Sequence, residues 1–373
     1  MMIMSGSTYG NIFRITTWGE SHGAGVGVVV DGCPAGLPLT EADIQFFLDR
    51  RKPGTSRYST PRKEGDQVEI LSGVFEGKTT GTPISLLVRN TSQRSSDYSE
   101  IAGYYRPGHA DMTYDMKYGF RDYRGGGRSS GRETIGRVAA GAIAVKILES
   151  LGIQLFTYTR SIGPVKIHPK RFRIEEIKEN PLCMPDKEAA MEAEAYLEGL
   201  MKEGDSAGGV IECVIRGMKP GVGDPAFEKL NANLGKAILS IGAVKGFEIG
   251  DGFAAAGARG SQNNDPYAYA PDGSLQKLSN HSGGILGGIS DGSDIVVRAG
   301  FKPTPSVAAS QQTINKNGEN IEIEIKGRHD PIIVARAVVV VECMTALVMA
   351  DALLLGMSSK MDNVKQIWAP DSN

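Results

Sequence analysis

The chain lacks a strong excess of charge of either sign. Its 373 residues include 41 Lys and Arg against 43 Asp and Glu, which leaves a net charge of −2. A protein that binds nucleic acid through many phosphate contacts carries a clear positive excess, so no general nucleic-acid-binding function is expected. No linker-like segment divides the chain. We therefore expect one domain over residues 1–373, with its core at about 10–355 and a C-terminal tail at 356–373.

The chain also lacks the features of secreted, membrane and metal-binding proteins. The N-terminus has no basic segment followed by an apolar run, so no secretory signal is expected. The most apolar stretch, residues 332–356, is interrupted by Arg336, Glu342 and Asp351, which favours a buried helix over a membrane span. The five histidines show no i, i+4 pair, and no CxxC occurs, so no metal site is expected. The four cysteines, which are scattered along the chain, are Cys33, Cys183, Cys213 and Cys343. Free thiols at such positions fit a reducing cytoplasm.

Glycine, in contrast, is abundant at 48 residues, which predicts many tight turns. Alternating or β-branched runs predict strands over residues 12–18, 26–30, 68–74 and 83–88. Apolar stripes predict helices over residues 40–51, 130–152, 187–202 and 332–356, the third exposed and the fourth buried. Strand pairs with irregularly placed helices favour an α+β fold over a regular βαβ alternation.

Polar residues at the predicted helix starts suit capping. Thr40 is placed to cap the first helix, and Ser130 with Glu133 has the spacing of a capping box. Asp330 suits the N-cap of the C-terminal helix, with Pro331 in its first turn.

Two segments recur in the same order along the chain. ILSGVFEG (70–77) resembles ILGGISDG (285–292), and VVVDGCPAGLP (28–38) parallels CVIRGMKPGVGDP (213–225). Duplicated halves that share one site would produce this pattern. Chance similarity between glycine-rich strand–turn segments would produce it too.

The segment from Arg106 to Glu133 combines three devices that bind anions. Arg124, Arg128 and Arg132 flank the glycines 125–127 and two serines, directly before a predicted helix. Small residues let the backbone approach a ligand, a helix start offers free N–H groups, and arginine forks match phosphate. The segment is neither a P-loop nor a dinucleotide fingerprint, because no GK[ST] ends it and no strand leads straight into it.

The GESHG segment at residues 19–23 allows two interpretations. Taken as G-x-S-x-G it would be the nucleophile elbow of a serine hydrolase, with Ser21 as nucleophile and His329 as a partner. That motif requires a helix after the turn, and GAGVGVVV predicts a strand instead. The second interpretation makes His22 a proton donor in a tight glycine turn.

Further polar loops could contribute to the same chemistry. His109 follows Pro-Gly on a rigid turn, and residues 50–63 form a basic loop with one aromatic residue, which fits a small polyanion better than RNA. Two more candidate loops are KPTPS (302–306) and GRHDP (327–331).

Taken together, these segments resemble the chorismate synthase family from about Gly10 to Leu355. Trp18 stands where the family commonly has Phe, and Gly242 where Asn is frequent. The ordered set is far more specific than any one of its motifs, which are GESHG, RRKPGTSRY, RPGHAD, YRGGGRSSGRET, AVKGFEIGDGF, RGSQN, GGILGGISDG, KPTPS and GRHDP.

The resemblance implies a fold and an activity. The fold is a sandwich of antiparallel sheets with helices, assembled as a homotetramer. The activity is the 1,4-anti elimination of phosphate from 5-enolpyruvylshikimate 3-phosphate (EPSP) to give chorismate, a lyase reaction that ends the shikimate route and needs reduced FMN. NADPH is a possible reductant. No nucleic acid and no membrane takes part.

The resemblance also assigns roles to individual residues. His22 and His109 become proton donors near the flavin and the leaving phosphate, and Asp330 assists removal of the C6 hydrogen at the flavin. Arg51 and Arg57 belong to a basic pocket for substrate or NADP, with Arg50, Arg106 and Arg132 as further substrate candidates. FMN contacts fall on Arg128, Ser129, Ser130, Gly242, Ala243, Gly287, Lys302, Pro303, Thr304, Pro305, Ser306 and Arg328.

Overall fold

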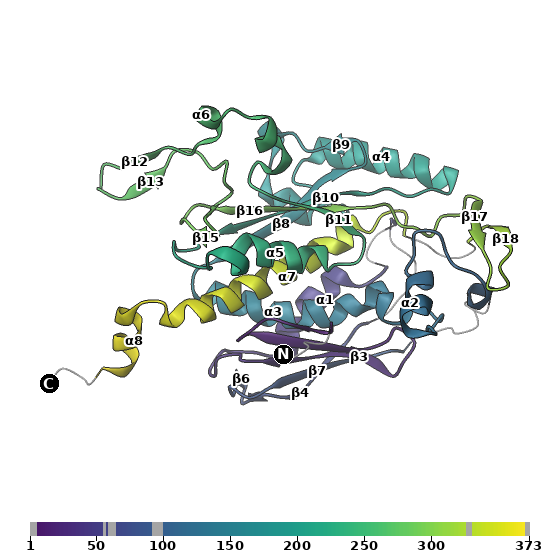
Figure 1. The fold of residues 1–373 in the computed structure, drawn as a ribbon, viewed down its shortest axis with the longest axis horizontal. Coiled ribbons are helices and arrows are strands. Elements are labelled where there is room, and N and C mark those ends of the chain that lie inside the picture. Colours follow the sequence, from purple (N-terminus) through teal and green to yellow (C-terminus); the bar gives the residue numbers. More distant parts are fainter. Residues whose placement is uncertain (1–5, 55–56, 59–64, 92–99, 326–329, 370–373) are drawn as a thin grey trace.

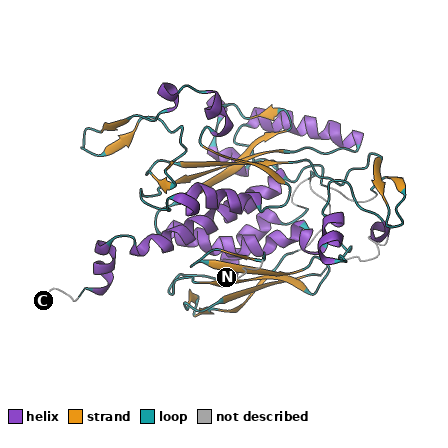
Figure 2. Ribbon diagram, in the orientation of Figure 1, coloured by secondary structure: helices purple, strands orange, loops and turns teal. Residues whose placement is uncertain are grey.

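The computed structural model describes residues 6–54, 57–58, 65–91, 100–325 and 330–369. In this part of the chain, two five-stranded antiparallel sheets enclose a layer of helices (Figure 1; Figure 2). The first sheet has the order β1 (Thr8–Tyr9), β2 (Arg14–Gly19), β3 (Gly25–Asp31), β7 (Ile84–Arg89) and β4 (Val68–Ser72). The second has the order β11 (Val244–Ile249), β16 (Ile295–Phe301), β10 (Gly209–Arg216), β8 (Gln154–Ile162) and β9 (Val165–Lys166). The α+β prediction is confirmed.

Helices fill the space between the sheets and cover one outer face. The inner layer consists of α1 (Glu41–Arg51), α3 (Thr134–Ser150), α5 (Leu230–Leu239) and α7 (Val334–Leu355) (Figure 1). The outer face of the second sheet carries α4 (Lys187–Glu203), which buries Ala189, Ala193 and Leu197 on one side. Three short helices lie further out: α2 (Asp111–Tyr118), α6 (Gly260–Asn263) and α8 (Met361–Trp368).

Small hairpins occupy the periphery. The pairs are β5 (Val74–Phe75) with β6 (Lys78–Thr79), β12 (Tyr267–Tyr269) with β13 (Leu275–Lys277), β14 (Ile285–Leu286) with β15 (Ile289–Ser290), and β17 (Gln311–Ile314) with β18 (Asn320–Ile323). Figure 1 places β15 and β17 at opposite ends of the molecule. Residues of the β14–β15 hairpin therefore lie far from the β17–β18 hairpin.

The two halves of the chain share one connectivity. The first half runs β2, β3, α1, β4, β7, α3, and the second runs β8, β10, α5, β11, β16, α7. Within the sheets the order β2-β3-β7-β4 corresponds to β8-β10-β16-β11. The repeated segments 28–38 and 213–225 leave β3 and β10, and the segments 70–77 and 285–292 precede β7 and β16. The shared order agrees with the hypothesis of duplicated halves.

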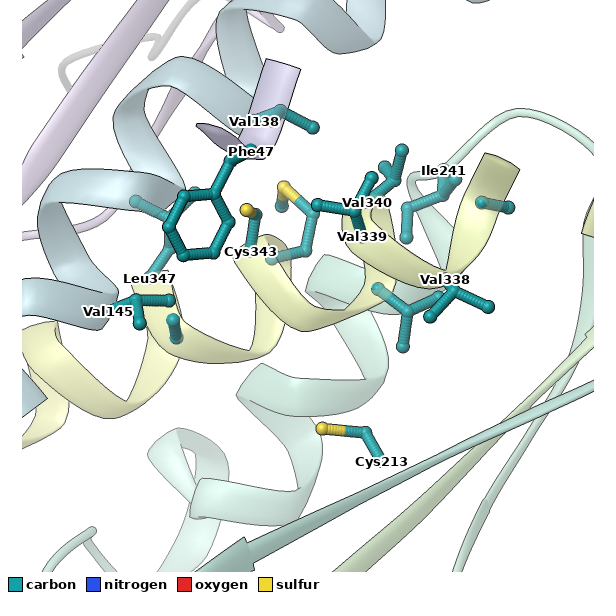
Figure 3. Packing of buried hydrophobic residues seen from close by; sticks show 14 of the residues in the cluster. Phe47, Val138, Val145, Cys213, Ile241, Val338, Val339, Val340, Cys343 and Leu347 are labelled. Carbon is teal, nitrogen blue, oxygen red and sulfur yellow. The ribbon is translucent and has the colours of Figure 1, made fainter. Parts of the chain in front are cut away.

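The core forms where α3, α7 and α1 meet. Phe47 of α1, Val145 of α3 and Leu347 of α7 belong to one buried cluster (Figure 3). α7 lies in an apolar segment, residues 334–358, long enough to cross a membrane, but 78% of its most apolar window is buried inside the protein. The prediction of a buried C-terminal helix is therefore confirmed.

The predicted helix starts need correction. α3 begins at Thr134, after two 3₁₀ turns, and Ser130 accepts a hydrogen bond from the Arg132 N–H of the second turn. The predicted capping box does not form, because the Glu133 carboxylate binds Arg137 at 2.8 Å. The residue that precedes α7 is Ile333, and Asp330 instead accepts a hydrogen bond from Arg336. At α1 the prediction is confirmed: Thr40 N–H and hydroxyl both donate to Asp43 Oδ2 at 2.8 Å.

We expect the Gly141→Ala substitution to lower the free energy of unfolding. A Cβ atom at Gly141 would lie 2.2 Å from Cys343 Cβ and 2.7 Å from its Cα, so α3 and α7 would have to move apart. Such overpacking costs about 1–3 kcal/mol. Denaturant unfolding measures the change.

The matched control is Gly199→Ala in α4, where a Cβ atom meets no other atom within 4 Å. This variant is expected to gain up to about 1 kcal/mol, because alanine favours the helix. Equal stability of the two variants would contradict the close packing of α3 on α7.

Candidate active site

The three-glycine loop lies between two histidines that are distant in the sequence. A Cβ atom at Gly125 would stand 2.3 Å from His22 Cε1, and one at Gly126 would stand 3.2 Å from His109 Cε1. Both glycines have left-handed φ angles, +65° and +83°, which L side chains rarely adopt. The glycines thus let the backbone pass between the two imidazoles. The sequence predicted that these glycines approach a ligand closely. The structure shows that they closely approach His22 and His109, the proposed proton donors.

His22 sits in the turn between β2 and β3 and is 6% exposed. Its Nδ1 lies 3.1 Å from Ser21 Oγ. The side-chain amide of Asn90 donates to the carbonyls of Glu20 and Gly23, each at 2.8 Å, and so fixes the shape of the turn. The turn joins two strands, so the strand–turn–helix context of a hydrolase elbow is absent here. His329, the other candidate for a triad, lies outside the described residues.

His109 lies on the turn that precedes α2, as the Pro-Gly dipeptide predicts. Its partner loop follows β16: Lys302 Nζ donates to the carbonyl of Gly108 at 2.6 Å. A Cβ atom at Gly108 would approach Pro305 Cβ to 3.1 Å. The loop 302–306 therefore packs directly against the histidine turn, although the two are far apart in sequence.

The loop 302–306 offers groups suited to an anion. Burial and the nearby Lys245 charge lower the pKa of Lys302. Thr304 Oγ1 is buried and has no hydrogen-bond partner among the described residues. Ser206 Oγ donates to the Thr304 carbonyl at 2.8 Å and anchors the loop. The loop thus carries an ammonium group and a buried hydroxyl, two kinds of donor that can bind an anion.

Ala243 belongs to the same region. Its carbonyl accepts the Lys302 N–H at 3.0 Å, and its φ angle of +71° is a strained conformation for a residue with a Cβ atom. Gly242 precedes it, and a Cβ atom there would meet no atom within 4 Å. Two more predicted cofactor contacts are therefore placed next to Lys302.

A buried cluster of arginines and carboxylates lies on the other side of the glycine loop. Asp66, fully buried, accepts hydrogen bonds from Arg51 and, at 3.0 Å, from Arg132. Arg336 donates to Asp330 at 2.6 Å and to the Arg51 carbonyl at 3.1 Å. Burial lowers the pKa of Arg336, although the Asp330 charge opposes that effect. Among the described residues, the cluster brings three arginines together with two carboxylates, and each of these carboxylates accepts a hydrogen bond from an arginine.

Sequence reasoning missed three of these residues. Asp66 and Arg336 are embedded in segments without a motif. Asn90, which also accepts from Arg132 Nε at 3.0 Å, follows a strand without any distinguishing pattern. Asp66 has a φ angle of +44°, an unusual conformation that only the structure reveals.

The remaining predicted arginines are committed to protein partners. Arg50 binds Glu342 with both terminal nitrogens, at 2.9 and 2.6 Å. Arg106 binds Asp111 in the same forked manner, at 2.7 and 2.8 Å. Arg57 is exposed and pairs with Glu194 and Glu198 of α4 at 2.8 and 2.9 Å. Arg57 is thus directed at α4 and away from the Asp66 cluster.

The predicted flavin contacts of the glycine loop are also held within the protein. Arg128 donates to the Thr17 hydroxyl at 2.7 Å, and Ser129 Oγ donates to the Gly126 carbonyl at 2.7 Å. These bonds fix the loop between the histidines.

One predicted residue, Gly287, stands apart from this assembly. Gly287 lies in the β14–β15 hairpin, which precedes β16, whereas Lys302 follows it. β16 contains 7 residues and spans roughly 20 Å, so Gly287 is at the far end of the sheet (Figure 1). Arg328 lies outside the described residues.

The chain is similar to known proteins over nearly its whole length. The family model described as chorismate synthase matches residues 13–354. The chain belongs to the chorismate synthase family. A chorismate synthase of Lachnoclostridium phytofermentans is 67% identical over 98% of this chain and 100% of the relative, and one of Chloroflexus aurantiacus is 55% identical over 94% and 96%. A solved structure titled as a crystal structure of chorismate synthase aligns with a TM-score of 0.75 and 33% identity over 96% of both chains.

Membership of the chorismate synthase family makes the protein a lyase of the shikimate pathway, the route to the aromatic amino acids. The family uses a reduced flavin. The serine hydrolase interpretation of GESHG is not supported, because every one of these relatives is named chorismate synthase.

We expect Gly125→Ala to reduce turnover about 100-fold, because its Cβ atom would displace His22 by more than 1 Å. The matched control is Gly119→Ala, which also has a left-handed φ angle, +80°, but has no atom within 4 Å of the place its Cβ atom would take. Both variants bear similar backbone strain, about 1–2 kcal/mol. Steady-state turnover of the two variants separates the strain from the displacement of His22. An equal loss of turnover in both would argue against the close approach at Gly125.

Proposed function

We propose that this protein catalyses the 1,4-anti elimination of phosphate from EPSP to give chorismate, with reduced FMN as its flavin. The observation that carries the proposal is the placement of His22 and His109 on either side of the glycine loop. Each of the two proton-transferring groups then lies against the backbone of one small region, the glycine loop. Basic groups from Lys302 and the Asp66 cluster flank that region, as an anionic substrate requires.

The loop 302–306 fits the phosphate of FMN. Lys302 supplies a positive charge, and the buried Thr304 hydroxyl supplies a donor without a protein partner among the described residues. Ala243 and Gly242 border the same loop, and we extend the contact set to Pro303, Pro305, Ser306 and Arg328. When bound, the reduced flavin supplies the electron-rich partner that the elimination requires.

His109 donates a proton to the leaving phosphate in this proposal. A neutralised phosphate is a better leaving group, because less charge has to develop on it in the transition state. His22 holds a proton on the other side of the glycine loop, at the flavin. Asp330, fixed by Arg336 at 2.6 Å, assists removal of the C6 hydrogen.

The carboxylates of the substrate bind to arginines of the Asp66 cluster in this proposal. Arg51 and Arg132 are both held by Asp66, so their guanidinium groups are oriented before a ligand arrives. Arg50 and Arg106 are each paired with a carboxylate of the protein, so we give them no direct contact with the substrate. We assign Arg51 and Arg57 to NADPH as well, if the enzyme reduces its own flavin.

Gly287 can reach a flavin only if another copy of the chain supplies it, since it lies at the far end of β16 from Lys302. We therefore propose a homotetramer in which neighbouring chains complete each flavin site. Exposed apolar side chains on the first sheet and between β11 and β13 support contact between copies, among them Trp18, Leu71, Phe253 and Tyr269. We place the enzyme in the cytoplasm.

We expect phosphate release from EPSP under anaerobic conditions to depend strictly on reduced FMN. His22→Ala and His109→Ala should each lower kcat by about 10²–10⁴-fold, because each removes a proton donor. Flavin binding, measured by the change in flavin absorbance, should remain close to that of the unaltered enzyme.

The control for these variants is Ser21→Ala, which removes the hydroxyl next to His22 Nδ1 and should lower kcat far less than His22→Ala. Phosphate release without any flavin, or ordinary kcat in both histidine variants, would contradict the proposed function.

The shared flavin site predicts complementation between two inactive variants. Gly287→Asp would place a carboxylate near the flavin phosphate, and aspartate tolerates the left-handed φ angle of +62° there. Mixed oligomers of Gly287→Asp with His109→Ala should recover activity, because some sites combine the intact His109 of one chain with the intact Gly287 of another.

Each variant assembled alone serves as the control and should stay inactive. The expected recovery in a mixed dimer unit is about half of full activity, since one of its two sites is intact on both sides. If the mixture stays as inactive as its components, Gly287 does not act across a subunit boundary.

A further inference from the structure

One ring nitrogen of His109 lies within hydrogen-bond distance of a buried carboxylate. His109 Nδ1 lies 2.9 Å from Asp111 Oδ1, and Asp111 is 2% exposed. The opposite edge of the ring, with Cε1 and Nε2, lies against Gly126, 3.2 and 3.5 Å from the position of a Cβ atom there. One nitrogen thus faces the carboxylate and the other faces the glycine loop.

Two groups compete for His109 Nδ1, and the charge of Asp111 decides between them. Arg106 Nη2 lies 3.0 Å from this nitrogen and could donate to it. If Nδ1 accepted that bond, its lone pair would face the Asp111 oxygen at 2.9 Å, and the two would repel each other. A proton on Nδ1 removes the repulsion and makes a charge-assisted hydrogen bond to the carboxylate.

The groups around Asp111 keep its carboxyl group ionised. Burial alone would raise the pKa of Asp111, but hydrogen bonds from Arg106 and His109 hold it far below its ordinary value. Arg106 also donates its backbone N–H to Asp111 Oδ2 at 3.1 Å, and Arg121 Nε lies 3.8 Å from Oδ1. The other charged groups nearby are Asp115 and Lys316, which pair at 3.1 Å, and Lys302 at the Gly108 carbonyl.

We propose that Asp111 is a positioning residue that holds His109 with its proton on Nδ1, so that Nε2 faces the glycine loop as the proton-transferring atom. The inference rests on the proposed role of His109 as the proton donor. Before the reaction both ring nitrogens carry a proton. The Nε2 proton passes to an oxygen of the leaving phosphate, and the neutral imidazole keeps the Nδ1 proton bonded to Asp111.

The test is ¹⁵N nuclear magnetic resonance of the full chain with labelled histidine, where the His109→Ala spectrum identifies the His109 signals. The unaltered protein should show neutral His109 as the Nδ1–H tautomer. In Asp111→Asn the carboxylate charge is gone, so Arg106 can donate to Nδ1. We then expect the Nε2–H tautomer to appear.

The steady-state kinetics of Asp111→Asn test the same contact between Asp111 and His109. Asp111→Asn should lower kcat at least about 10-fold and leave the KM for EPSP nearly unchanged, because Asp111 is buried and acts through His109. The matched control is Asp115→Asn, one turn along α2, which removes the same charge but pairs with Arg121 and Lys316. This control should leave the His109 tautomer and kcat unchanged.

An Nε2–H tautomer in the unaltered protein would overturn the inference without any variant, as would an unchanged tautomer in Asp111→Asn. A shifted tautomer with ordinary kcat would support the contact between Asp111 and His109. It would also count against His109 as the proton donor, so the inference and the proposed function fail separately.

Discussion

The missing Cβ atoms of Gly125 and Gly126 are the constraint on which the rest of the site depends. The loop passes between His22 and His109 with so little room that a single methyl group at Gly125 would overlap His22 at 2.3 Å. The left-handed φ angles of both residues exclude other side chains on conformational grounds as well. Because the loop is this thin, two imidazoles from the turns before β3 and before α2 pack against neighbouring residues of one loop.

Charge balance explains how a nearly neutral protein buries several arginines near the glycine loop. These arginines are tolerated because Asp66 and Asp330 neutralise part of their charge, and an uncompensated buried charge would be costly. The carboxylates also hold the arginines in one orientation.

Much of the site could be predicted from the sequence, because glycine, histidine and proline fix local backbone shape within a few residues. GESHG and RPGHAD presented His22 and His109 on turns, and the glycine run marked a close approach. Asp66, Asn90 and Arg336 could not be predicted, since their importance depends on contacts with residues distant in sequence. Asp66 meets Arg132, 66 positions away. Ser130 caps the 3₁₀ turn before α3, but its predicted capping box with Glu133 does not form, because Glu133 pairs with Arg137. The predicted capping role of Asp330 is wrong for a similar reason, because Asp330 pairs with Arg336.

The duplicated connectivity explains why one site draws on both halves of the chain. Asn90 follows β7, and Lys302 follows β16, which are equivalent strands of the two sheets. Arg132 and Asp330 likewise precede the equivalent helices α3 and α7. Each half therefore contributes the end of a strand and the segment before a helix to the same region. The first half contributes the amide of Asn90 and the guanidinium of Arg132. The second half contributes the ammonium of Lys302 and the carboxylate of Asp330. Because equivalent backbone segments carry different side chains, a symmetric scaffold provides an asymmetric site. A substrate whose phosphate and carboxylate groups are separate is itself asymmetric and requires such a site.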